Sequence, residues 1–130
     1  MNTWIEHAKN EYGIEISPKQ VGLFELYLRE LLEWNQKFNL TAIREEEGIR
    51  IKHFLDSLAC LSVYAPQQCR MIDIGSGAGL PGMVLALARP QWDVHLLEST
   101  NKKAEFLRLA AAELKTGNVS VIADRAETAA

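Results

Sequence analysis

Two carboxylates flank a glycine-rich loop in the middle of this 130-residue chain. The loop follows the apolar run "MIDI" and alternates Gly75, Gly77 and Gly79, with Asp73 just before the first glycine. Glycines in such a loop let the backbone turn sharply and approach a ligand closely, because a side chain would block it. Glu98 stands at the end of a second strand-like run, "DVHLL". Together these residues predict a ligand site.

The two acids also indicate which ligand the loop binds. A carboxylate at the second strand's end can accept hydrogen bonds from both hydroxyls of a ribose, which many cofactors share. Asp73 is more selective, because its charge repels a pyrophosphate but attracts a sulfonium or an ammonium group. We therefore predict S-adenosylmethionine as the cofactor. The alternatives are a nicotinamide-dependent oxidoreductase domain and a non-catalytic cofactor-binding module.

Each of these acids also has a purely structural interpretation. Asp73 could cap a helix or bond a turn, and Glu98 could be a solvated strand end. After the third strand-like run, an amide of Ala126 or Glu127 could bond an adenine edge. Equally, this last segment could be a helix start with Asp124 as its cap.

Strand-like and helix-like segments alternate in the second half of the chain, at residues 71–74, 81–88, 93–97, 101–115 and 119–122. This alternation predicts parallel strands with right-handed crossovers and a ligand site at their carboxyl ends. The first run is apolar apart from Asp73, as expected for a central strand buried on both faces. Gly117 is predicted to cap the second crossover helix.

The first 65 residues predict a helical segment. Thr3 with Glu6, and Ser17 with Gln20, form capping boxes that open two helices, the first ending near Gly13. A third amphipathic helix is predicted over about residues 46–63. Its apolar face comprises Ile51, Phe54, Leu55, Leu58 and Leu61.

Composition excludes several classes of protein. The net charge of −3 argues against a protein that coats nucleic acid generally, so any RNA binding must be local. Neither an apolar run of about 18 residues nor a secretion signal is present, which predicts a cytoplasmic protein with no membrane partner. The spacing of cysteine and histidine indicates no metal site.

The motif D-I-G-S-G-A-G together with Glu98 resembles class I S-adenosylmethionine-dependent methyltransferases. The segments "NLTAI" (39–43) and "KHFLDSL" (52–58), placed before "MIDIGSGAGLPG", make the chain similar to the RsmG family, also called glucose-inhibited division protein B. The resemblance covers nearly the whole chain. It implies an α/β Rossmann-like fold with an amino-terminal helical segment.

The same resemblance implies a bacterial enzyme that methylates N7 of one guanosine in 16S ribosomal RNA, with that RNA or the small ribosomal subunit as partner. Gly75, Leu80, Ala126 and Glu127 would then correspond to cofactor-contacting positions. Guanine N7 carries a lone pair and no proton, so the transfer needs alignment and exclusion of water and no general base. We therefore name no catalytic residue.

Substrate contacts are predicted in the helical half. Asn39 and Thr41 either face the substrate pocket or cap the approach to the third helix, and His53 is either a substrate contact or a structural histidine. Local positive charge there could meet RNA phosphate, although acidic neighbours make a solvated helix face an equal interpretation. The positive residues are Arg44, Arg50, Lys52 and His53.

The family's sheet has seven strands in the order 3-2-1-4-5-7-6, and the strand-like runs here correspond to its 3-2-1 half. We therefore expect an incomplete sheet, with a helical segment over residues 1–65 and a cofactor-binding half over residues 66–130. The first strand then becomes an exposed edge, which predicts self-association or less cooperative unfolding. Full turnover by these 130 residues alone is not expected.

Overall fold

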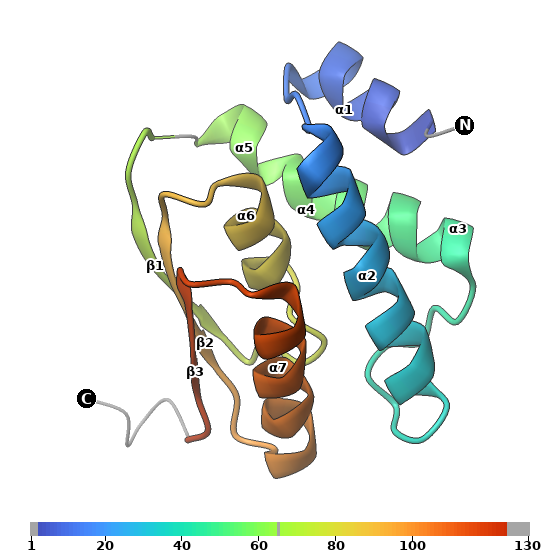
Figure 1. The fold of residues 1–130 in the computed structure, drawn as a ribbon, viewed down its shortest axis with the longest axis vertical. Coiled ribbons are helices and arrows are strands. Elements are labelled where there is room, and N and C mark those ends of the chain that lie inside the picture. The colour runs from blue at the N-terminus through green and yellow to red at the C-terminus, as the bar shows by residue number, and fades with distance from the viewer. Residues whose placement is uncertain (1–2, 65, 125–130) are drawn as a thin grey trace.

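The computed structural model describes residues 3–64 and 66–124. Its strands are β1 (Arg70–Ile74), β2 (Asp93–Leu97) and β3 (Val119–Ile122). Its helical elements are α1 (Thr3–Tyr12), α2 (Pro18–Asn35), α3 (Glu46–Gly48), η1 (Ile49–Leu55), α4 (Asp56–Leu58), α5 (Cys60–Val63), α6 (Gly82–Ala88) and α7 (Asn101–Leu114). Figure 1 shows three layers, with α6 and α7 between the sheet and the amino-terminal helices.

The three strands form one parallel sheet in the order β1-β2-β3, which confirms the predicted β-α-β-α-β unit. The register pairs Ile74 with Leu97 and Leu97 with Ile122, so the carboxyl ends of the strands lie at one edge. A ligand site at this edge would draw residues from more than one strand. None of the helices in the described part of the chain has the length and apolar character that a membrane crossing requires.

The expectation that β1 is buried on both faces is wrong for the described residues. Ile72 and Ile74 are 61% and 65% exposed. Both crossover helices cover the same face of the sheet, so the opposite face of β1 meets no described helix (Figure 1). The expectation of an exposed edge is confirmed, because β1 pairs only with β2 among the described strands.

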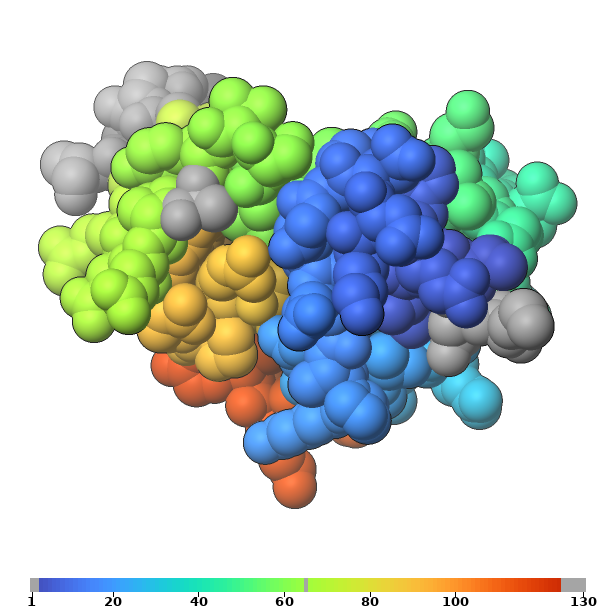
Figure 2. Space-filling view, turned by 90° about the horizontal axis from the view of Figure 1, so that it is seen from above, coloured from blue at the N-terminus to red at the C-terminus, as the bar shows by residue number. Residues whose placement is uncertain are grey.

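Local signals set the ends of the first two helices. Gly13 follows α1 with φ +68°, a left-handed conformation that glycine adopts without strain. The predicted capping box opens α2: Gln20 N–H donates to Ser17 Oγ at 3.2 Å, and Ser17 N–H donates to Gln20 Oε1 at 2.8 Å. The Gln20 amide also donates to the carbonyls of Leu87 and Ala88. The start of α2 thereby satisfies the end of α6, and Figure 2 shows these segments in contact, in blue and gold.

The predicted third helix is a nearly continuous helical run with a π-helical centre, η1. The wider π turn changes which side chains face inward. Ile49 is fully buried, whereas Ile51, predicted to be inward, is 37% exposed. Phe54, Leu55, Leu58 and Leu61 are buried as predicted.

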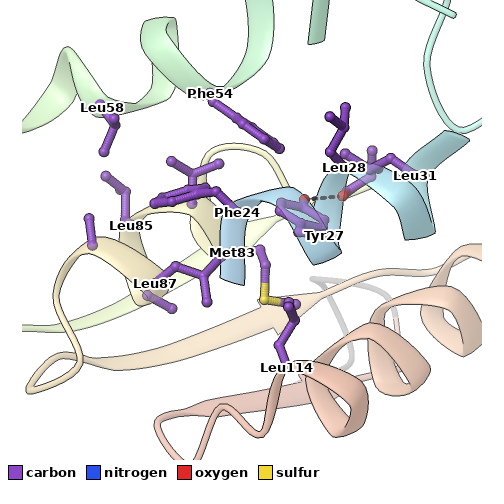
Figure 3. Packing of buried hydrophobic residues seen from close by; sticks show 14 of the residues in the cluster. Phe24, Tyr27, Leu28, Leu31, Phe54, Leu58, Met83, Leu85, Leu87 and Leu114 are labelled. Carbon is purple, nitrogen blue, oxygen red and sulfur yellow. Dashed lines mark hydrogen bonds between the residues drawn. The ribbon is translucent and has the colours of Figure 1, made fainter. Parts of the chain in front are cut away.

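One hydrophobic core joins the helical half to the α/β half. Figure 3 shows side chains from α2, η1 and α4 meeting those of α6 and α7. Aromatic rings fill the middle of the helical layer, where Phe24 lies 5.3 Å from both Trp4 and Phe54, centroid to centroid. Burying one such ring contributes about 1.5–3 kcal/mol, so the two halves stabilise each other.

The predicted cap at Gly117 is wrong. Helix α7 ends instead at Lys115, which is the only non-glycine residue with positive φ in the described part of the chain, at +54°. An L-residue in this conformation brings its Cβ close to a carbonyl oxygen, at a cost of about 1–2 kcal/mol. Gly117 does not have a positive φ.

We predict that Lys115→Gly raises the free energy of unfolding by about 0.5–1 kcal/mol, because glycine removes the left-handed strain but adds unfolded-state entropy. Gly117→Ala is the matched control, since an added Cβ there meets no atom within 4 Å. The control should be neutral or slightly stabilising. Urea unfolding measures both variants, and destabilisation by Lys115→Gly would contradict the prediction.

Candidate cofactor-binding site

The glycine loop leaves β1 and turns back toward α6 through three glycines with positive φ: Gly75 (+73°), Gly77 (+57°) and Gly79 (+94°). The Leu97 carbonyl at the end of β2 accepts from the Gly75 amide at 2.8 Å and from the Ser76 amide at 3.2 Å. The loop is therefore fixed against the neighbouring strand at the carboxyl edge of the sheet.

Gly79 is required for space as well as for conformation. A Cβ at this position would lie 2.5 Å from the Tyr27 hydroxyl and 3.0 Å from Met83 Cβ. Neither atom can retreat easily, because both Tyr27 and Met83 are fully buried. The side-chain-free backbone lets α2, α6 and the loop pack together.

Asp73 lies in β1 with its side chain under the start of α6. Its Oδ2 accepts from the Gly82 amide at 2.9 Å, so the carboxylate caps this helix. Burial raises the pKa of Asp73, and the charge of Glu98 raises it further, against the opposing effect of the Gly82 bond. Asp73 therefore has the helix-capping role that was considered for it. The same position places its negative charge, which burial destabilises, at the mouth of the loop.

Glu98 joins the end of β2 to the same loop. Its Oε1 accepts from the Gly77 amide at 2.8 Å, and its Oε2 accepts from the Thr100 amide at 2.9 Å. Burial alone would raise the pKa of Glu98, but these bonds and the charge of Lys103 outweigh burial, and the pKa is lowered. With 5% exposure, Glu98 is not the solvated strand end considered as an alternative.

These contacts decide what the site can do chemically. A carboxylate has about four lone-pair positions, and the Gly77 amide and the amide and hydroxyl of Thr100 occupy part of them, so Glu98 keeps capacity to accept from a ligand hydroxyl. The amides of Gly77 and Gly82 are already bonded to carboxylates. A pyrophosphate would need such loop and helix-start amides, and it would meet two negative charges instead. The geometry favours a cationic nucleoside over a dinucleotide.

Residues predicted to contact substrate lie in the helical half. Thr41 Oγ1 lies 2.6 Å from His53 Nε2, which joins the loop after α2 to η1. Burial lowers the pKa of His53, so its ring is neutral near pH 7. Asn39 is exposed, and its Oδ1 accepts from an Arg44 guanidinium nitrogen. Leu80 is half-buried within the glycine loop. Ala126 and Glu127 lie outside the described residues.

Sequence patterns did not identify the role of Asn35, whose side chain bonds the backbone of the loop after α2 that carries Thr41. Asn35 is buried at the end of α2, and its Oδ1 accepts from the amides of Leu40 at 2.8 Å and Thr41 at 3.1 Å. Its carbonyl accepts from Arg44 Nη1 at 2.8 Å. An asparagine that ends a helix before a polar loop is a signal for this kind of side-chain to backbone bonding.

Fewer of the predicted positive residues are available to RNA than the sequence indicates. Arg50 donates to Glu25 at 2.8 Å and 3.3 Å, and it also pairs with Glu46 at 3.4 Å. Its charge is therefore used within the fold. Lys52 is exposed and leaves its ammonium group in solvent.

Aromatic contacts bring the Thr41 segment toward the same end of the molecule as the glycine loop. Trp34, near the end of α2, lies 5.6 Å from Phe106 of α7, and the ammonium of Lys102 lies 4.8 Å from the Phe38 ring. Helix α7 begins shortly after Glu98. Figure 1 shows the loop after α2 and the carboxyl ends of the strands at the lower end of the view.

Comparison with known proteins identifies relatives of this sequence. A chain named ribosomal RNA small subunit methyltransferase G from Alkaliphilus oremlandii (strain OhILAs) is 49% identical over 116 residues, which is 88% of this chain and 48% of the relative. Proteins of the same name are 46% identical in Roseiflexus sp. (strain RS-1), over 90% of this chain and 50% of the relative, and 42% identical in Staphylococcus haemolyticus (strain JCSC1435), over 96% and 52%.

The chain thus spans about half the length of the curated relatives it matches. A family model described as rRNA small subunit methyltransferase G matches residues 20–130, a range that includes the Asn35 loop, the η1 segment and both carboxylates. On this match and these identities, the chain belongs to the GidB family of rRNA small subunit methyltransferase G proteins.

Proposed function

We propose that this chain forms the cofactor-binding part of an S-adenosylmethionine-dependent methyltransferase that acts on N7 of a guanosine in 16S ribosomal RNA. One observation carries the proposal: Asp73 and Glu98 occupy the amides of Gly82 and Gly77, which leaves a negatively charged site beside a glycine loop. The names of the relatives support the substrate class. The partner is then 16S RNA or the small ribosomal subunit, and the compartment is the cytoplasm.

In this proposal residues 66–130 bind the cofactor and residues 1–65 carry the candidate substrate contacts. The free lone pairs of Glu98 would accept from the ribose hydroxyls, and the charge of Asp73 would attract the ammonium group. Gly75, Gly77, Gly79 and Leu80 would line the close approach of the backbone, with Ala126 and Glu127 at the adenine edge. When bound, the cofactor supplies an electrophilic methyl group.

The remaining chemistry is positioning. Guanine N7 has no proton to remove, so the protein must hold the base in line with the methyl group and keep water out. Neutral His53, fixed by Thr41, can donate or accept one hydrogen bond without adding charge beside the cationic cofactor. Exposed Asn39 and Lys52 lie on the same segments and are available to RNA.

We predict that Asp73→Asn and Glu98→Gln both weaken binding of S-adenosylhomocysteine by at least about tenfold, the effect of losing one charge-assisted contact.

Their effects on stability should be opposite. Asp73 has a raised pKa, so its ionisation costs stability above that pKa, and Asp73→Asn should raise the melting temperature at pH 7. The gain should shrink as the pH falls through the folded-state pKa and vanish well below the unfolded-state pKa of about 3.9, where the carboxyl is protonated in both states.

Glu98 has a lowered pKa, so its ionised form contributes stability above the unfolded-state pKa, and Glu98→Gln should lower the melting temperature at pH 7. Calorimetric titration and thermal melts measure both quantities. Asp93→Asn is the control for binding, because this half-buried carboxylate begins β2 at the far end of the strand, where it pairs with Arg70 and His95. Tight binding of NAD by the wild-type chain would contradict the proposed cofactor.

The RNA substrate is tested by methyl transfer under single-turnover conditions, with the chain in excess over deproteinised small-subunit RNA and with labelled S-adenosylmethionine. We predict that any label transferred is recovered as 7-methylguanosine after digestion. His53→Gln should slow the transfer about tenfold through one lost hydrogen bond, with unchanged affinity for S-adenosylhomocysteine. His7→Gln on α1 is the control. Label on any other nucleoside would contradict the proposed substrate.

Self-association through β1 belongs to the same proposal. Ile72 and Ile74 expose an apolar surface beside an edge strand, which favours pairing with a second copy. We predict that light scattering shows a mass that rises with concentration, and that Ile74→Lys returns the chain to a monomer. Val63→Lys changes a side chain on α5 that is more exposed still, at 89%, and should have no effect. A monomer at all concentrations, with a sharp two-state melt, would contradict this prediction.

A further inference from the structure

Tyr27 is the one residue of α2 whose side chain is bonded to the glycine loop. Its ring is fully buried, and its hydroxyl donates to the Ala78 carbonyl, 51 positions along the chain. Ala78 stands between Gly77 and Gly79, whose positive φ angles give the loop its shape. The bond therefore acts on the backbone of the loop at its centre, from outside the α/β half.

The surroundings of the Tyr27 hydroxyl make it a hydrogen-bond donor to the loop. Desolvation raises the pKa of Tyr27, so the group stays protonated and acts as a donor. The space that a side chain at position 79 would need is already filled by this hydroxyl, at 2.5 Å from the ideal Cβ position. The loop and Tyr27 are thus complementary in both shape and hydrogen bonding.

The Tyr27 ring also reaches the segment that carries the candidate substrate contacts. It stacks on Phe54 of η1 at 5.4 Å with an interplanar angle of 19°, and Figure 3 shows Tyr27 between Phe54 and Met83. Phe54 follows His53, whose ring is held by Thr41. A continuous set of contacts therefore runs from the Thr41 loop through η1 and Tyr27 to Ala78.

We propose that Tyr27 is a positioning residue for methyl transfer, which fixes the cofactor loop relative to the substrate-facing η1 segment. The inference rests on the proposed function for its catalytic meaning. In a reaction that depends on alignment alone, a bond that sets the distance between cofactor loop and substrate segment affects rate directly. Tyr27 touches neither reactant in this arrangement and acts through Ala78 and Phe54.

Tyr27→Phe tests the proposal, because it keeps the ring, the stacking on Phe54 and the core volume while it removes the donor. Tyr12→Phe is the matched control, a partly buried tyrosine of the same helical layer. The first measurement is hydrogen exchange in the unliganded chain. Exchange of the Gly77 and Gly79 amides should rise about tenfold in Tyr27→Phe, the effect of about 1.4 kcal/mol, while β3 amides stay unchanged.

The second measurement is the affinity for S-adenosylhomocysteine, well below the melting temperature. We expect about fivefold to tenfold weaker binding in Tyr27→Phe and none of this loss in Tyr12→Phe. A purely structural hydroxyl would lower the melting temperature without changing loop exchange or affinity, and that result would overturn the proposal. If exchange rises but the wild-type chain binds no S-adenosylhomocysteine, the loop contact stands and the proposed function fails.

Discussion

The carboxyl edge of the sheet depends on two hydrogen bonds from backbone amides to carboxylates, Gly82 to Asp73 and Gly77 to Glu98. A loop built on glycines has few side chains of its own to fix it, so its shape must come from groups outside it. Parallel pairing in register brings the ends of β1 and β2 to one edge, where both carboxylates reach the same loop. The amides of Gly77 and Gly82 are thereby bonded to carboxylates and are not free for phosphate.

The environments of the two acids push their pKa values in opposite directions, which separates their roles. Glu98 is satisfied by two amides and stays ionised, so it offers a constant acceptor for hydroxyl groups. Asp73 is penalised by burial and by the charge of Glu98, so its ionised form is stabilised by any cation that binds beside it. A positively charged ligand offsets this cost of ionising Asp73, whereas a phosphate increases it. In the proposed function, the same pair of residues would supply both acceptance of hydroxyls and selection by charge.

Sequence patterns predicted the features that depend on neighbouring residues. The three strands, the crossover helices and the Ser17 capping box follow from periodicity and capping signals within a few positions, and the structure confirms them. The features that patterns missed depend on distant contacts. Ile51 is exposed on the π turn of η1, an element that packs against α1, and Arg50 pairs with Glu25 from another helix. The sequence did not indicate the hydrogen bond of the Tyr27 hydroxyl. An aromatic residue on the apolar face of a helix predicts burial, but it does not identify the acceptor that its hydroxyl meets.

The amino-terminal helices are part of the candidate site and more than a support for the sheet. Asn35 holds the Thr41 segment, Trp34 packs that end of α2 on Phe106 of α7, and Tyr27 holds the loop after β1. Three contacts from one helix thus reach the loop that carries Thr41, the helix after Glu98 and the glycine loop. Because α2 is continuous between them, a displacement at one contact must be absorbed by the other two or by loss of core packing. In the proposed reaction, which needs no general base, this shared rigid element would set the relative position of cofactor and substrate.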